Sequence, residues 1–385
     1  MRGLVSTTHR AADSTLRVLR SRSGNFQLLA LAAQWVLATS PRMTIVWIGA
    51  YLGISQSTAR RIHVRSVIAI LILALACITP DATHAQEFPT KPIRIIVPFA
   101  PGGNIDITAR AIAPGLGEAL GTSVVVESKP GAGGTIGTAQ VASAPPDGHT
   151  LTLGSTAAIT ISPSIYKGAG YDPLKDLVAI GAIHEVALVL SVANNVPVKN
   201  YAEFLAYAKS RNGQLSVATA GTGTTNHLTA QLFDLNTGVK TTHVPYKGSG
   251  PALNDLVAGQ VESTFDQTPS SLPHIKEGRI RALAVTSRKR IASLPDLPTL
   301  DELGLKDFEA STFTGLFGPA AIPPAVRDKL AAALIKVLAT PAVRERFKGL
   351  GAEMLDMDRD AFAAFVAKDF AKWAKIVAEA KITAE

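Results

Sequence analysis

The chain has 385 residues and a formal net charge of +8, but nearly all of that charge lies at one end. Residues 1–85 hold nine Arg, no Lys and two Asp, a net of +7, whereas residues 86–385 hold 29 basic and 28 acidic side chains, a net of +1. A near-neutral main part removes the chief electrostatic argument for a nucleic-acid partner. The single cysteine, Cys77, excludes a disulfide within the chain.

The first 85 residues end in the pattern of a secretion signal. A basic stretch at 60–65 is followed by an apolar stretch at 66–76, which is shorter than the roughly 20 residues that a membrane span needs. Small residues at 83 and 85 then resemble a cleavage site. The sequence therefore predicts a signal peptide over 64–85, cleavage before Gln86 and a periplasmic protein. A lipoprotein anchor at Cys77 is the lesser alternative.

Residues 1–63 precede that signal and are harder to interpret. The segment 48–62 has the pattern of a helix-turn-helix, but a secretion signal follows it directly. We favour the interpretation that 1–63 is a non-native or uncertain N-terminal extension, with translation starting further along the chain.

The part of the chain from residue 86 onward alternates between strand and helix patterns. About 300 residues are more than a single hydrophobic core usually supports, so we expect two lobes. Glycine, serine and threonine clusters lead from many strands into helices, as in parallel βα units. Amphipathic helices are expected at 322–338 and at the C-terminus, where an apolar stripe begins at Phe362. The expected strands are 93–99, 123–127, 150–154, 178–192, 215–219, 242–246, 261–265, 280–286 and 312–318.

Two of these strand-to-helix junctions are rich in glycine, at 93–110 and 216–228. Glycine lets backbone N–H groups approach a ligand, and a helix start adds unpaired amides and the positive end of the helix dipole. Neither glycine loop contains Lys or Arg. The pattern indicates two half-sites for a small anion, most simply a carboxylate, without a catalytic group.

Five blocks of the sequence resemble, in order and spacing, the periplasmic receptors of tripartite tricarboxylate transporters, also called the Bug family. They lie at 98–110, 129–137, 146–150, 243–252 and 283–287. The resemblance implies an α/β, two-lobed periplasmic-binding-protein fold of type II. Each lobe would be a mostly parallel sheet flanked by helices, with residues 86–188 and 309–385 forming the first lobe and 189–308 the second.

The same resemblance implies which residues meet the ligand in the cleft between the lobes. The first loop would supply Phe99, Gly102, Gly103 and Asp106, and the second would supply Gly221, Gly223, Thr224 and His227. Ser155 and Thr156 would form a third edge. Asp266 ends an expected strand, where α/β sheets commonly bind ligands.

Several of these residues also have purely structural explanations. Asp106 and Arg110 are spaced as an ion pair on one helix face. His227 could be a buried helix histidine, and Asp266 could be a helix cap. The glycine-rich stretch 129–137 has Ile136 in place of the last glycine of a dinucleotide motif, so we interpret it as a structural turn. Pro114 predicts a kink or early end of the first helix.

The function implied is an extracytoplasmic receptor that binds a small carboxylate and passes it to membrane permease subunits. A receptor that signals to a membrane sensor kinase is the alternative, and a secreted enzyme on the same fold is a third. The eight His show no metal-binding spacing, and no nucleophile motif is present. We therefore expect no catalytic residue, no cofactor, no metal and a monomer.

Overall fold

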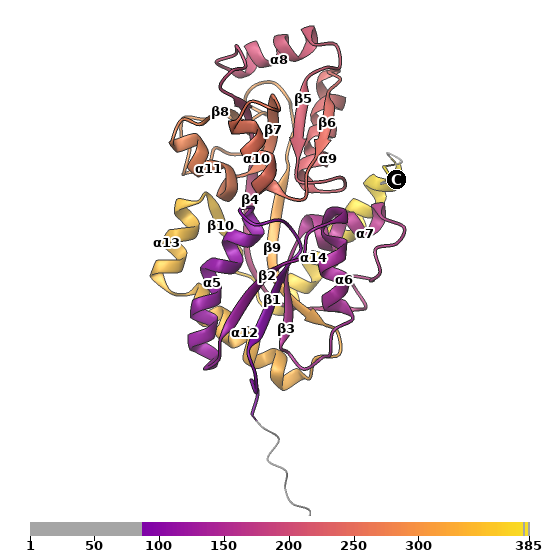
Figure 1. Ribbon diagram of the computed structural model, residues 1–385, viewed down its shortest axis with the longest axis vertical. Coiled ribbons are helices and arrows are strands. Elements are labelled where there is room, and N and C mark those ends of the chain that lie inside the picture. The colour runs from indigo at the N-terminus through magenta and orange to yellow at the C-terminus, as the bar shows by residue number, and fades with distance from the viewer. Residues whose placement is uncertain (1–86, 380–381, 384–385) are drawn as a thin grey trace, which may run out of the picture. The chain divides into compact units, whose positions relative to one another are not determined.

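The computed structural model describes residues 87–379 and 382–383 (Figure 1). The chain divides into two compact units, Met1–Ala85 and Gln86–Glu385, and the fold below is that of the second. The extension 1–63, the signal segment 64–85 and Cys77 lie outside the described residues, so the expectations about them remain predictions. Within the described part of the chain, no helix is long and apolar enough to cross a membrane.

One long strand, β4 (Leu177–Ala193), connects two sheets (Figure 1). Its first half pairs antiparallel with β9 (Ser311–Pro319), up to Ala187. From Leu188 onward it pairs antiparallel with β7 (Ser263–Gln267) and β8 (Ile280–Val285). Most of its side chains are buried, as expected for a run of Val, Ile, Leu and Ala covered on both faces.

The first sheet continues outward from β9. The strands β2 (Val124–Ser128), β1 (Ile93–Val97) and β3 (Thr150–Ser155) are parallel to one another, and β3 pairs antiparallel with β9. The short β10 (Ala352–Met354) pairs with the other edge of β4. The helical segments of this part are α5 (Asn104–Leu120), η1 (Ala132–Gly134), α6 (Thr135–Ala142), η2 (Thr156–Ile161), α7 (Ser162–Ile165), α12 (Pro324–Leu338), α13 (Pro341–Gly349) and α14 (Arg359–Glu379).

The second sheet is built from a continuous stretch of the chain. In it, β5 (Ser216–Thr219) lies between β6 (Thr242–Pro245) and β7 and is parallel to both. Its helices are α8 (Tyr201–Ser210), α9 (Thr225–Thr237), α10 (Ser249–Val257) and α11 (Thr268–Lys276).

Each sheet has its own hydrophobic core. One cluster of buried apolar side chains draws its members from residues 188–310, with Phe204, Phe233 and Phe265 fully buried. A second cluster draws its members from 93–186 and 316–352. We therefore use lobe 1 for residues 87–187 and 311–379, and lobe 2 for residues 188–310.

The nine strands expected from the sequence are present, and the helix expected at 322–338 is α12. The three-residue β10 was not expected. The expectation of mostly parallel sheets holds for β1, β2 and β3 and for β5, β6 and β7, but the pairs that involve β4 or β9 are antiparallel. The reason is connectivity: β4 carries the chain into lobe 2 and β9 brings it back, so the two must run in opposite directions.

One of the two outcomes expected at Pro114 is wrong, because α5 does not end there but continues to Leu120. A kink at Pro114 remains a prediction. Pro114 lies on the exposed face, where water can satisfy the carbonyl that loses its helical partner. The adjacent Gly115 has a packing reason. A Cβ there would lie 3.1 Å from both methyl groups of Val337, so glycine lets α5 approach α12 closely.

Candidate functional site

The loop after β1 is held in shape by Asp106. Gly102 adopts a positive φ of 85°, and its N–H donates to Asp106 Oδ2 at 3.0 Å. The Arg110 Nε donates to the other carboxylate oxygen at 2.9 Å, which raises the pKa of Arg110. Because both oxygens of this buried carboxylate have partners within lobe 1, Asp106 shapes the loop and does not line the interlobe cavity described below.

The second glycine loop lies between β5 and α9. Gly221 and Gly223 both have positive φ, and Thr224 Oγ1 donates to Gly221 O at 2.7 Å. His227 Nδ1 accepts the Gly223 N–H at 3.3 Å, so this ring nitrogen is unprotonated. Burial, and then the neighbouring His243, lowers the pKa of His227 to about 4. The histidine is thus a neutral support of the loop.

A buried carboxylate lies behind these loops in lobe 2. Asp266 is 1% exposed and accepts hydrogen bonds from Ser249 Oγ, Ser270 Oγ and, at 2.8 Å, Asn226 Nδ2. Burial raises its pKa, and these hydrogen bonds act against the shift. Gln267 Nε2 donates to Asn226 Oδ1 at 3.1 Å, which extends the network along β7.

A cavity of about 20 Å³ lies where the two lobes meet, with room for about one water molecule. None of its lining residues is charged. Lobe 1 contributes Phe99, Gly103, Asn104, Ile105, Ser155 and Ala157, and lobe 2 contributes Ala220, Thr224, Asn226, Ser249 and Gln267.

Two helices begin at this cavity from a glycine N-cap and so without a side-chain cap. The N-cap of α5 is Gly103 and that of α10 is Gly248, and neither provides a side-chain acceptor for the first amides. The start of α9 differs, because Thr224 Oγ1 accepts the His227 N–H at 3.4 Å. Uncapped helix starts present N–H groups and positive dipole ends, which favour an anion.

The lobes touch on both sides of the cavity. Ala100 N–H donates to Lys247 O at 2.9 Å, and Tyr166 Oη–H donates to Thr222 O at 2.9 Å. The approach is closest at Gly250, where a Cβ would lie 2.0 Å from Pro101 O. The structure is therefore a closed form, in which glycine is required for the two loops to meet.

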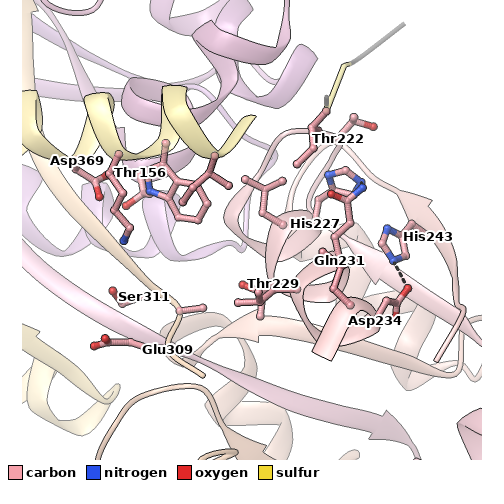
Figure 2. Close-up of a pocket in the computed structure, with 18 of the residues that line it drawn as sticks. Thr156, Thr222, His227, Thr229, Gln231, Asp234, His243, Glu309, Ser311 and Asp369 are labelled. Atoms are coloured by element: carbon pink, nitrogen blue, oxygen red, sulfur yellow. Dashed lines mark hydrogen bonds and ion pairs between the residues drawn. The ribbon is translucent and has the colours of Figure 1, made fainter. Parts of the chain in front are cut away.

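The structure brings four of the eleven predicted residues to the cavity wall, namely Phe99, Gly103, Ser155 and Thr224. Gly102 and Asp106 lie in the supporting turn, while Gly223 lies against Ile165 and Tyr166. Gly221 lines a neighbouring hollow of about 160 Å³. Thr156 and His227 line a separate and larger groove (Figure 2), and Asp266 lies behind Ser249 and Asn226.

Four polar lining residues were not expected from the sequence: Asn104, Asn226, Ser249 and Gln267. Asn104 and Asn226 lie in the two glycine junctions, Ser249 lies in the block 243–252, and Gln267 directly follows Asp266. Their role depends on which side chains from opposite lobes meet, which spacing along one chain does not reveal.

Among the described residues, no group of three His, Cys, Asp or Glu side chains is arranged to hold a metal ion. The contacts also bear on the purely structural explanations expected for Asp106, His227 and Asp266. Asp106 and Arg110 do form an ion pair. His227 is a buried helix histidine. Asp266 is not the cap of α11, whose N-cap is Gln267 without a side-chain cap; Asp266 accepts the Ser270 hydroxyl instead.

Solved structures identify the class of the fold. The periplasmic binding protein BugD is 40% identical and matches 77% of this chain and 100% of that one with a TM-score of 0.75. MatC from Rhodopseudomonas palustris with bound malate is 34% identical, with a TM-score of 0.72, and covers 75% of this chain and all of that one. An R. palustris protein with adipate is 34% identical and has a TM-score of 0.74, over 77% of this chain and 99% of that one. The chain has the type II periplasmic-binding-protein fold, as predicted.

Sequence comparisons identify the family. The model of the tripartite tricarboxylate transporter family receptor, TctC, matches residues 108–382. An Agrobacterium vitis protein from the TAR-I ttuE-ttuC' intergenic region is 37% identical over 359 residues, 92% of this chain and 99% of that one. BugT of Bordetella pertussis is 36% identical over 315 residues, 82% of this chain and 96% of that one. This chain belongs to the TctC family of periplasmic solute receptors.

Proposed function

We propose that this protein binds a small carboxylate between its lobes and delivers it to the permease of a tripartite tricarboxylate-type transporter. The observation that carries the proposal is the pair of uncapped helix starts, α5 and α10, that face one enclosed cavity without a charged side chain. Each helix start stabilises an anion by about 0.3–2 kcal/mol. The solved relatives with malate and adipate support the same ligand class.

The lining residues have distinct roles in this proposal. Phe99, Gly103, Ser155 and Thr224 contact the ligand, together with the polar side chains that the sequence did not indicate. Gly102, Gly221 and Gly223 give the loops their shape, and Asp106 and His227 hold those loops. The cavity is too small for an organic acid in this form, so the lobes must separate to admit the ligand and close on it afterwards.

The hydrogen bonds of Asp266 suggest which carboxylates fit best. Ser249 has one hydroxyl proton, and it donates that proton to Asp266, so toward the cavity Ser249 Oγ offers only lone pairs. Lobe 2 therefore presents an acceptor next to the anion site. We infer that the preferred ligand carries a donor, a hydroxyl or an ammonium group, beside its carboxylate.

Differential scanning fluorimetry with a ligand panel tests both the carboxylate ligand and the preference for a donor group beside the carboxylate. Malate and succinate form a matched pair that differs by one hydroxyl group. We expect carboxylates to raise the melting temperature, malate more than succinate, and neutral sugars to leave it unchanged. A response to sugars alone would overturn the carboxylate assignment, while equal shifts for malate and succinate would overturn only the donor preference.

Delivery and export need cellular experiments. Deletion of the gene should abolish uptake of the identified carboxylate, and uptake should return with a plasmid copy. Loss of a transcriptional response with intact uptake would support the sensor-kinase alternative instead. N-terminal sequencing of the periplasmic protein should begin at or near Gln86, and retention of residues 1–63 would contradict the predicted signal peptide.

A further inference from the structure

A groove of about 1050 Å³ lies beside the junction of the lobes (Figure 2). It shares no lining residue with the small cavity. Helix α9 and strand β6 form its lobe 2 side. Helix α14, the start of β9 and Glu185 of β4 form its lobe 1 side. Its volume lies at the upper end of the range of small-molecule sites, so the groove can take an organic ligand without any movement of the lobes.

The side chains of this groove combine negative charge with apolar surface. Among the described lining residues, four carboxylates face one lysine, Lys372. Aromatic rings from Phe313, Phe365 and Trp373 and aliphatic side chains of α9 supply the apolar part. Such a lining suits a cation with an apolar body, since aromatic faces and carboxylates both attract a cation.

The four carboxylates differ in how far the protein already neutralises them. Glu309 pairs with Arg288 at 2.6 Å, and Asp234 lies 3.4 Å from His243 Nε2. Glu185 instead accepts from the neutral Ser311 Oγ at 2.5 Å. Asp369 accepts from the neutral Thr160 Oγ1 at 2.7 Å, burial raises its pKa, and the nearby Lys372 acts against that shift. Glu185 is therefore the carboxylate best placed to attract an added cation, and Asp369 is the next.

An unpaired polar atom in the groove points to a ligand independently of the charges. Thr229 is 2% exposed, and its Oγ1 has no hydrogen-bond partner among the described residues. It is one of the lining residues, and Figure 2 shows it among the side chains around the groove. A buried hydroxyl without a partner is unfavourable, so a ligand N–H donor would be favoured there.

We propose that this groove is a second ligand site, which binds a protonated organic amine with an apolar or aromatic body. Glu185 and Asp369 would attract the ammonium group, Thr229 Oγ1 would accept one of its N–H groups, and the aromatic side chains would cover the body. This site would be independent of the carboxylate cavity in chemistry, because the cavity has no charged side chain and the groove is acidic.

Benzylammonium and benzyl alcohol are matched probes, since they share size and ring and differ in charge. Trp373 is the only tryptophan from residue 86 onward, so its fluorescence reports on the groove. We expect a saturable fluorescence change with benzylammonium and binding at least about tenfold weaker for benzyl alcohol. Loss of the signal in Trp373→Phe would confirm its origin, with calorimetry measuring the binding in that variant.

Substitutions then separate charge from shape. Glu185→Gln and Asp369→Asn should each weaken benzylammonium binding about tenfold, whereas Glu309→Gln should change it less than twofold because Arg288 already compensates that charge. Thr229→Val should weaken binding without lowering the melting temperature, since its hydroxyl has no partner to lose. Malate-induced stabilisation provides a separate measure that each variant is folded.

The proposal fails if benzylammonium shows no saturable binding, or if benzyl alcohol binds equally well. It also fails if Glu309→Gln has the same effect as Glu185→Gln, because the attraction would then be a general surface effect. Each of these results is independent of whether a carboxylate binds in the cavity, so it leaves the proposed receptor function untouched.

Discussion

The cavity and the groove lie next to each other and share segments of the chain, yet their lining groups differ in charge and chemistry. Ser155 lines the cavity and Thr156 lines the groove, and in the second loop Thr224 lines the cavity and His227 the groove. The cavity relies on backbone amides and neutral side chains, whereas the groove relies on charged side chains and rings. Backbone groups cannot be exchanged by mutation, so the cavity should be altered mainly by changes in shape.

The largest effect is expected from Gly250→Ala. A Cβ at residue 250 would lie 2.0 Å from Pro101 O, so the loops of the closed form could not meet. Residue 250 has an ordinary helical φ in α10, and alanine should suit lobe 2 by itself. We expect carboxylate affinity to fall at least about 100-fold, or about 3 kcal/mol.

Small-angle scattering should show that Gly250→Ala no longer contracts when carboxylate is added. Gly168→Ala is the control, because a Cβ there has nothing within 4 Å. Normal affinity in Gly250→Ala would mean that ligand binding does not require the closed form described here.

The second-largest effect is expected from a change in pH, which acts through His227 in the groove. His227 has a pKa of about 4 in the folded protein, against about 6.5 for an ordinary histidine side chain, so the unfolded chain binds its proton first as the pH falls. Its contribution to the free energy of unfolding is complete above pH 6.5 and is lost progressively down to about pH 4. The loss is up to about 1.4 kcal/mol per pH unit.

Denaturant titrations of the wild type and His227→Gln across that pH range measure this contribution. The variant should lose less stability on acidification. His184, whose pKa burial lowers to about 3, acts in the same direction and is unchanged in both proteins. Parallel pH curves for the two proteins would show that residue 227 does not remain neutral when the chain folds.

Asp266→Asn should lower the free energy of unfolding by about 2 kcal/mol. The substitution leaves one acceptor oxygen for Ser249, Ser270 and Asn226 and puts an amide donor in place of the other oxygen, so a buried donor loses its acceptor. The preference for malate over succinate should also decrease, because Ser249 then competes with the other donors for one oxygen and can donate into the cavity. Asp255→Asn is the control, since Asp255 is partly exposed and, among the described residues, its carboxylate accepts only from Tyr246 Oη.

The smallest effect is expected at the first loop. Asp106→Ala leaves the Gly102 N–H without its acceptor and should weaken carboxylate binding by about 1 kcal/mol. Arg110→Ala removes only the ion pair of a half-exposed guanidinium and should change affinity by less than about 0.5 kcal/mol. Calorimetric titration of both variants distinguishes loop support from surface charge, and equal losses would contradict the support role.

The sequence predicted the fold well because its signals are local. The buried strand 177–193 appears as an apolar run, and the glycine junctions mark the βα turns of both lobes. β10 escaped notice because three residues carry no periodic pattern. The continuous α5 was missed because Pro114 faces solvent, and the face of a helix that a proline occupies depends on its packing against α12.

The candidate site was only partly predictable for a different reason. Phe99 and Gly103 were expected from the family resemblance, and the glycine junction itself indicated only that a ligand loop lies there. Ser249 and Gln267 meet the cavity only because lobe 2 closes against α5, which is a long-range contact. Asp266 was noticed as a strand-end carboxylate, but its burial behind Ser249 depends on α10 and α11 folding over β7.

The path of β4 and β9 also sets the order in which the molecule can assemble. Lobe 2 is one uninterrupted stretch of chain, so its core can form as soon as that stretch is available. Lobe 1 must wait for the return strand: Thr156 Oγ1 accepts from Phe313 N, a residue 157 positions later. Because contacts of such sequence separation slow folding, we expect lobe 2 to acquire hydrogen-exchange protection first and lobe 1 to complete the folding reaction.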